Sequence, residues 1–159
     1  MSETRETPPE MDPDLPLSVT REVRDSCLCL HLQRAARVVA RHFDAALAPV
    51  GLTNRQFSLL MALNRPERPR LGALVPLLGM DRTTLTAALK PLERRGLVTS
   101  SPDPSDSRAR RLALTAEGRA RLRAALPVWR RAQAEIESDA GAGKMADLRA
   151  DLAALAPPR

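Results

Sequence analysis

Aromatic residues are nearly absent from this chain of 159 residues, which has no tyrosine, one tryptophan and two phenylalanines. The core must therefore be built from leucine, alanine and valine, and such a core favours packed helices over a β-sandwich. Hydrophobic residues make up 43% of the chain, which is sufficient for one domain of ordinary size. The composition thus predicts a mainly α-helical single domain.

Long apolar segments are missing too. No run of about 18 apolar residues occurs, so we expect no transmembrane helix, and the N-terminus lacks the basic and apolar regions of a signal peptide. The chain has only two cysteines, Cys27 and Cys29, which would point to different sides of one helix. These absences predict a cytoplasmic protein with reduced thiols.

Signatures of catalysis and of metal binding are equally scarce. There is no Gly-rich phosphate loop and no serine nucleophile motif, and the two histidines, His31 and His42, are too few for acid–base chemistry. Cys27 and His31 are one helical turn apart, but a tetrahedral metal site needs more ligands than these. We therefore expect no enzyme activity, no cofactor and no metal site.

The positive charge is unevenly distributed. The net charge is +6, and residues 65–131 alone contain 15 Lys and Arg against 6 Asp and Glu, whereas the remainder contains 10 against 13. An Arg-rich proteome would explain the number of arginines but not their segregation. The pattern favours a polyanionic partner for residues 65–131.

The N-terminal part reads as a tail followed by a long helix. Residues 1–18 are rich in proline and acidic residues, which is typical of a mobile segment. From 19 to 48, apolar residues recur at three- and four-residue steps, as at Leu32, Val39 and Phe43, and predict one helix. Because its apolar surface is wider than one stripe, we expect this helix to pack on its own domain and on a partner subunit.

Two shorter helices should follow. Thr53 and Gln56 form a capping box, with a Thr N-cap and Gln three residues later, that starts the first of them. A second helix over 71–78 is disfavoured by Gly72 and Pro76, so we expect it to be short or bent. A tight turn at residues 79–80 comes next.

The next helix is better specified. Asp81 is a good N-cap for a helix over 82–95, and Gly96 is the expected left-handed residue after its end. Its buried stripe consists of Leu85, Ala88, Leu89 and Leu92. The residues that point elsewhere all carry hydrogen-bond donors: Arg82, Thr83, Thr84, Thr86 and Lys90.

A β-hairpin is predicted after Gly96. Residues 97–100 and 111–114 have the pattern of short strands, and the polar, basic loop between them contains Arg108 and Arg110. Thr115 then caps a long helix to about residue 139, and a final helix runs close to the C-terminus. The fold class is therefore mainly α with a small β-hairpin wing, in a winged helix-turn-helix lobe.

This arrangement is that of a DNA-reading protein. An α-helix fits the major groove, where Arg82 can address guanine while the threonines and Lys90 contact bases or phosphates. Arg108 and Arg110 in the loop can follow the backbone or enter the minor groove. The alternative is a winged helix that binds only other proteins, and such a protein would show no salt-dependent affinity for duplex DNA.

Two segments resemble the MarR family of winged helix-turn-helix regulators: MDRTTLTAALKPLERRGLV at 80–98 and DSRARRLALTAEG at 106–118. The resemblance implies a MarR-type domain over 19–157, with a winged lobe at 53–115 and dimerisation helices at 19–48 and 115–156. It implies a homodimer that binds a pseudo-palindromic double-stranded operator, with Arg108 in the minor groove, as a transcription repressor. Gly72 and Pro76 depart from the family pattern.

The resemblance also implies control by a small molecule. Family effectors are often aromatic carboxylates or phenols bound between the dimerisation helices and the winged lobe, and candidate pocket residues by position are His31, His42, Arg55 and Phe57. Peroxide-sensing members instead carry a reactive cysteine early in the first helix, to which Cys27 or Cys29 is similar. Those sensors place tyrosines around the thiol, and this chain has none. Release of a repressor by an aromatic effector and thiol-based redox sensing are therefore the two alternatives.

Overall fold

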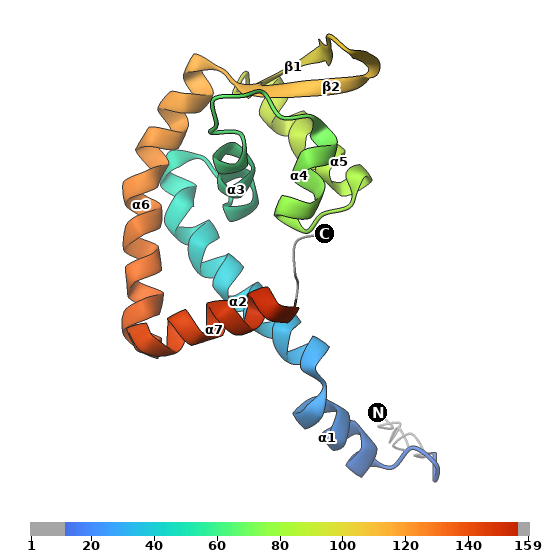
Figure 1. Cartoon of the computed structure of the whole chain (residues 1–159). Coiled ribbons are helices and arrows are strands. Elements are labelled where there is room, and N and C mark those ends of the chain that lie inside the picture. The colour runs from blue at the N-terminus through green and yellow to red at the C-terminus, as the bar shows by residue number, and fades with distance from the viewer. Residues whose placement is uncertain (1–11, 156–159) are drawn as a thin grey trace, which may run out of the picture. The chain divides into compact units, whose positions relative to one another are not determined.

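The computed structural model describes residues 12–155, apart from the side chains at 107, 140 and 142. The chain divides between Val39 and Ala40 into two compact units, and α2 continues across the division. The described residues form helices and one two-stranded antiparallel sheet (Figure 1). The predicted fold class, mainly α with a β-hairpin wing, is confirmed.

The first unit contains α1 (Leu17–Ser26) and the first half of α2 (Leu28–Leu47). The predicted single helix over 19–48 is wrong at Cys27, whose ψ of 103° is extended and ends α1. Just before this break, the Ser26 hydroxyl donates to the carbonyl of Glu22 at 2.6 Å, a bond that is common where helices bend. Most of the predicted tail, residues 1–11, lies outside the described residues, and residues 17 and 18 already belong to α1.

Apolar side chains of the first unit stay exposed within the chain. No residue of α1 is buried, and Phe43 and Leu47 are the buried residues of α2, both in its second half. Packing of this part of α2 on its own domain and on a partner subunit stays a prediction. The exposed large apolar side chains in the described part of this unit are Leu15, Leu17, Val19, Val23, Leu28, Leu32, Val38 and Val39.

The second unit begins with the end of α2, a 3-10 turn (Ala48–Val50) and α3 (Asn54–Ala62). Both bonds of the predicted capping box are present: Thr53 Oγ1 accepts from the Gln56 amide, and Gln56 Oε1 accepts from the Thr53 amide, each at 3.2 Å. Gly51 follows the turn with φ of 68°, a left-handed conformation that glycine adopts without strain. These caps fix where α2 ends and α3 begins.

Helices α4 (Leu71–Leu78) and α5 (Arg82–Arg94) form the helix-turn-helix. The first is one of the shortest helices of the fold, as Gly72 and Pro76 predict, and it ends at Gly79 in the left-handed conformation. Figure 1 shows α3 between α6 and the α4–α5 pair, all of which it contacts. The core gathers around these elements, and its fully buried large side chains are Leu47, Leu59, Leu60, Leu74, Leu85, Leu92, Leu97 and Leu112.

The hairpin is longer than predicted. Its strands are β1 (Val98–Asp103) and β2 (Asp106–Leu114), so most of the predicted loop is strand. The ladder pairs Pro102 with Arg110 and then Asp103 with Asp106, and the register shift between these pairs makes residues 107–109 bulge from β2. The segment before α4 supports the hairpin, because Pro69 accepts a bond from the Leu112 amide at 3.0 Å.

Helix α6 (Ala116–Ala140) leaves the hairpin and is followed by α7 (Ala142–Leu155). Thr115 caps α6 as predicted, accepting from the Gly118 amide at 2.9 Å. Gly118 is required for packing, since a Cβ there would overlap the carbonyl of Leu97. Within the described residues, none of the helices has the length and apolar character needed to cross a membrane.

Candidate nucleic-acid interface

Helix α5 has one buried and one exposed side. Leu85, Leu89 and Leu92 are at most 3% exposed and anchor the helix in the core. Residues on the other side of a 3.6-residue helix must then face outward. Those exposed residues include the predicted reading residues Arg82, Thr83, Thr86 and Lys90, together with Ala87 and Arg94, which the sequence analysis did not select.

The fifth predicted reading residue, Thr84, belongs to the N-cap. Asp81 accepts from the Thr84 amide at 2.8 Å and from the Thr84 hydroxyl at 2.6 Å. These bonds, the hydroxyl bond first, lower the pKa of Asp81 from its ordinary value of 3.8. The Thr84 hydroxyl proton is thus engaged within the chain, whereas Thr83 has an exposed side chain.

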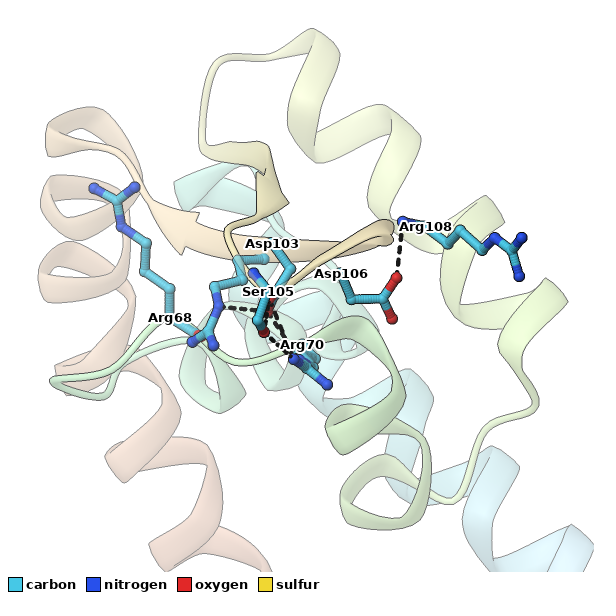
Figure 2. A network of polar contacts seen from close by, with 7 residues as sticks. Arg68, Arg70, Asp103, Ser105, Asp106 and Arg108 are labelled. Atoms are coloured by element: carbon cyan, nitrogen blue, oxygen red, sulfur yellow. Dashed lines mark hydrogen bonds and ion pairs between the residues drawn. The ribbon is translucent and has the colours of Figure 1, made fainter.

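The two predicted wing arginines are held differently. Arg108 is exposed, its own amide donates to Asp106 Oδ1 at 3.0 Å, and its side chain points away from the neighbouring polar groups (Figure 2). Arg110 instead donates through its guanidinium to the hydroxyl and the carbonyl of Ser100 on the opposite strand. Arg108 is therefore extended into solvent, and Arg110 is tied to the hairpin.

A polar network centred on Asp103 lies at the base of the bulge (Figure 2). The Asp103 side chain is fully buried and accepts from Arg70 Nε at 2.8 Å and from Arg111 Nε at 2.7 Å. It also accepts from the amide and the hydroxyl of Ser105, at 2.9 and 2.7 Å. These partners, Arg70 foremost, hold the pKa of Asp103 well below its usual range.

Sequence reasoning missed this network. Arg70 lies 33 residues before Asp103, in a proline-containing loop that offers no periodic pattern. The available signal was the aspartate itself, because a carboxylate in a strand next to a turn needs a partner if it is buried. Arg70 comes from the segment before α4, which meets β2 through an isolated bridge between Arg70 and Arg111.

A cavity of about 500 Å³ opens between α3, α4 and α6. Trp129 of α6 stacks on Phe57 of α3 with ring centroids 5.9 Å apart and rings 16° from parallel. The wall is mostly apolar, and Ser58 and Arg65 supply its polar groups. The complete lining is Phe57, Ser58, Met61, Ala62, Arg65, Leu77, Leu78, Leu126 and Trp129.

Comparison with known proteins places the chain. The sequence model of the MarR family matches residues 52–109. The DNA complex of the Mycobacterium tuberculosis transcriptional regulator MosR is 40% identical, with a TM-score of 0.76 over 82% of this chain and 94% of MosR. The chain belongs to the MarR family.

Other MarR-type relatives extend the comparison. The transcriptional repressor CouR, solved on a 23-mer DNA duplex, is 32% identical, with a TM-score of 0.75 over 89% of this chain and 98% of CouR. The transcriptional activatory protein BadR of Rhodopseudomonas palustris is 33% identical over 95 residues, which are 58% of this chain and 54% of BadR. The chain spans between half and two thirds of the length of the curated relatives that it matches.

Within this MarR fold, the four predicted effector residues are not gathered at one place in the second unit. Phe57 lines the cavity described above, whereas Arg55 is exposed on α3. His42 lines a different hollow, where its Nε2 is 3.1 Å from the carbonyl of Ala132 and 3.4 Å from Glu135. His31 belongs to the first unit and is exposed. The aromatic wall contributed by Trp129 was not anticipated.

The two cysteines of this MarR chain are free. Cys27 is half-buried at the break between α1 and α2, and Cys29 is exposed in α2, where Gln33 donates to its sulfur at 3.2 Å. Within residues 12–155, no cluster of three or more His, Cys, Asp or Glu has the arrangement of a metal site.

Proposed function

We propose that this protein is a homodimeric regulator that binds a pseudo-palindromic double-stranded DNA operator, represses transcription and is released by a small aromatic or phenolic effector. The supporting observation is the pairing of an anchored helix with an extended wing arginine. Arg82, Thr83 and Lys90 project from α5, while Arg108 projects from the bulge of the hairpin. Donors on a helix suit the major groove, and an arginine on a loop suits the narrow minor groove.

The relatives support the same conclusion. MosR and CouR, which are 40% and 32% identical, were solved in complex with DNA. BadR is named an activatory protein and CouR a repressor, so the direction of control differs among relatives. A reporter gene placed downstream of a DNA duplex that the protein binds tests this direction, and deletion of the regulator should raise expression of the reporter.

Selection of duplexes from a random pool by the full-length protein tests DNA binding. Fluorescence anisotropy should then show an affinity that falls steeply with salt, because phosphate contacts release counterions. Arg108→Ala should weaken binding to the selected duplex, and Arg130→Ala, at an exposed position on α6, is the matched control. Recovery of no duplex, or equal binding of single strands, would contradict the proposal.

The homodimer is supported by apolar side chains that lack cover in the single chain. Leu28, Leu32 and Val39 are exposed on α2, and Leu148, Leu152 and Leu155 are exposed on α7. Burying such surfaces in a twofold contact removes them from water. Sedimentation velocity should give a dimer, and Leu32→Glu should shift it toward monomer. A wild-type protein that is monomeric and still binds its duplex would contradict the proposed homodimer.

The effector pocket is supported by the cavity beside Trp129. An aromatic ring fits its apolar wall, and Arg65 can pair with a carboxylate or phosphate group. A second CouR structure, whose alignment with this chain is 33% identical, was solved bound to p-coumaroyl-CoA. Leu77 and Leu78 of α4 line the cavity, and α4 begins one residue after Arg70 of the Asp103 network. An occupant that moves α4 therefore has a direct route to the wing.

Trp129 is the only tryptophan, so all tryptophan fluorescence comes from a residue that lines this cavity. Titration with p-coumarate and with p-coumaroyl-CoA should change the emission and release the labelled duplex. Leu77→Glu should abolish the change, whereas Ala134→Glu, at an exposed position of α6 outside the cavity, should keep it. Release of duplex with no change in emission would assign the effector to another site.

A second function is favoured by the break at Cys27. The two thiols are not held on opposite sides of a continuous helix, and Cys29 is exposed. In a redox sensor, the Cys29 thiolate attacks an organic hydroperoxide, the O–O bond breaks, sulfur becomes a sulfenic acid, and the alkoxide leaves and takes up a proton. Attack by the Cys27 thiolate then forms a disulfide and expels hydroxide.

Intact mass spectrometry and duplex binding after mild peroxide treatment test this alternative. The wild type should gain an oxygen atom or lose two hydrogens, with loss of duplex. The double variant with Cys27→Ser and Cys29→Ser should stay bound. If that variant responds to peroxide like the wild type, thiol sensing is excluded.

A further inference from the structure

Asp103 is the buried charged residue at the centre of the wing's support. Its side chain is 0% exposed, and its two oxygens accept bonds from three segments of the chain. Arg70 donates from the segment before α4, Arg111 from β2, and Ser105 from the turn. A buried carboxylate that accepts this many bonds stays ionised and fixes the groups around it.

Two arginines share the Asp103 carboxylate, and the charge of Asp106 adds a smaller favourable interaction at Arg70. The arginine side chains are 47% and 34% exposed for Arg70 and Arg111. Each side chain is therefore partly exposed while its Nε donates to Asp103. Arg70 Nη2 also donates to Asp103 and Ser105, and Arg111 Nη1 donates to the carbonyl of Arg68. Removal of the Asp103 carboxylate would leave both arginines without an ion pair among the described residues, and partly exposed arginines bind phosphates readily.

The cluster also sits at the root of the segment that carries Arg108. Ser105 binds Asp103 through its amide and its hydroxyl, and its hydroxyl also accepts from Arg70 Nη2 at 2.8 Å. The next residue, Asp106, accepts from the Arg108 amide. Figure 2 shows these groups in sequence from the buried cluster to the extended arginine. Tethering the turn in this way limits where the bulge can place Arg108.

Resting on the proposed DNA-binding function, we infer that Asp103 is a positioning residue that sets the discrimination between operator and other DNA. It does so by fixing the loop of Arg108 and by withholding Arg70 and Arg111 from phosphates. Specific contacts need a defined loop, whereas non-specific binding depends on the number of free cations. Removal of the Asp103 carboxylate therefore weakens binding to the operator and strengthens non-specific binding to other DNA.

Asp103→Asn in the full chain tests the inference. Anisotropy is measured over a range of salt on a duplex selected by the wild type and on a scrambled duplex of equal composition. Affinity for the selected duplex should fall about tenfold, the range expected for loss of one arginine contact. Affinity for the scrambled duplex should rise, and its salt slope should steepen by up to about 1.8, the value for two added phosphate contacts.

Three variants keep the test decisive. Asp139→Asn changes the net charge equally at the far end of α6 and should alter neither slope nor discrimination. Arg70→Gln and Arg111→Gln remove one cation each, and they should lose discrimination without a steeper slope. If thermal melting shows that Asp103→Asn does not fold, these two arginine variants still test the role assigned to Asp103.

The outcomes separate this inference from the proposed function. If the wild type shows no salt-dependent duplex binding, the proposed function itself fails. Suppose that the wild type discriminates between the duplexes and that Asp103→Asn is folded. The role assigned to Asp103 is wrong if this variant loses affinity for both duplexes equally, or if its affinity for both is unchanged. Unchanged discrimination in both arginine variants would also overturn it.

Discussion

Helix α5 and the wing both present arginines to solvent, but different interactions hold them in place. The helix is anchored by leucines within its own sequence and capped by Asp81 at its first turn. The wing owes its support to Asp103, whose partner Arg70 lies 33 residues away. A helix surface is therefore specified locally, whereas the placement of a loop arginine depends on contacts between distant segments. The following predictions test this difference.

The largest effect should come from the anchorage of α5. Leu85 is completely buried, and Leu85→Ala should lower the free energy of unfolding by about 2–5 kcal/mol, the range for a truncated core leucine. Thr83→Ala, two residues earlier and exposed, should change it by less than about 0.5 kcal/mol. Urea denaturation measures both. Equal effects would mean that α5 is not anchored by its leucine stripe.

The next effect should separate the two wing arginines. Arg108→Ala should cost about 1–3 kcal/mol of binding to the selected duplex while the melting temperature stays unchanged. Arg110→Ala should cost less binding, because the Arg110 guanidinium is already bonded to Ser100. A larger loss for Arg110→Ala would reverse the assignment of the extended and the tied arginine.

A smaller effect is expected where the wing joins α6. The Thr115 hydroxyl donates to the Gly96 carbonyl at 2.6 Å and accepts from the Gly118 amide at 2.9 Å. Thr115→Ala should lower the free energy of unfolding by about 1 kcal/mol, the usual cost of losing an N-cap. Thr115→Ser keeps the hydroxyl and should restore most of the stability. No difference between the two would show that the cap is dispensable.

The smallest expected effect is the pH dependence of stability near neutral pH. The folded-state pKa values of Asp81 and Asp103 lie below the ordinary value of 3.8, so both contribute full stability above that value and lose it as pH falls through the lowered values. Urea midpoints between about pH 5 and pH 7 should not change through these groups. Below that range, Asp103→Asn should flatten the loss of stability more than Asp81→Asn, because Asp103 has charged partners.

Much of the winged lobe was predictable because its signals are local. The capping box at Thr53, the N-cap at Asp81 and the cap at Thr115 each mark a helix start within four residues. Gly96 stops α5 in the left-handed conformation, with φ of 67°. Gly118 was selected only as part of a family motif, and the structure supplies its reason in the carbonyl of Leu97.

Predictions from the sequence failed where segments distant in the chain come into contact. They also failed where the apolar periodicity continued through the end of a helix. The periodicity of apolar residues runs across Cys27, yet the helix ends there. The polar composition of residues 101–110 suggested a loop, but pairing with the opposite strand and bonds to Asp103 keep most of it in the hairpin. The effector residues chosen by position did not include Trp129, because α6 brings it to Phe57 only after folding.

The sequence by itself determined that the chain is helical, where most of its helices start, and that its cations concentrate on the winged segment, because capping, side-chain periodicity and charge act over a few residues. Only the tertiary structure decided which arginines are free and which are bound. A buried carboxylate selects its partners by proximity in space, and Asp103 meets Arg70 and Arg111 only when three separate segments pack together.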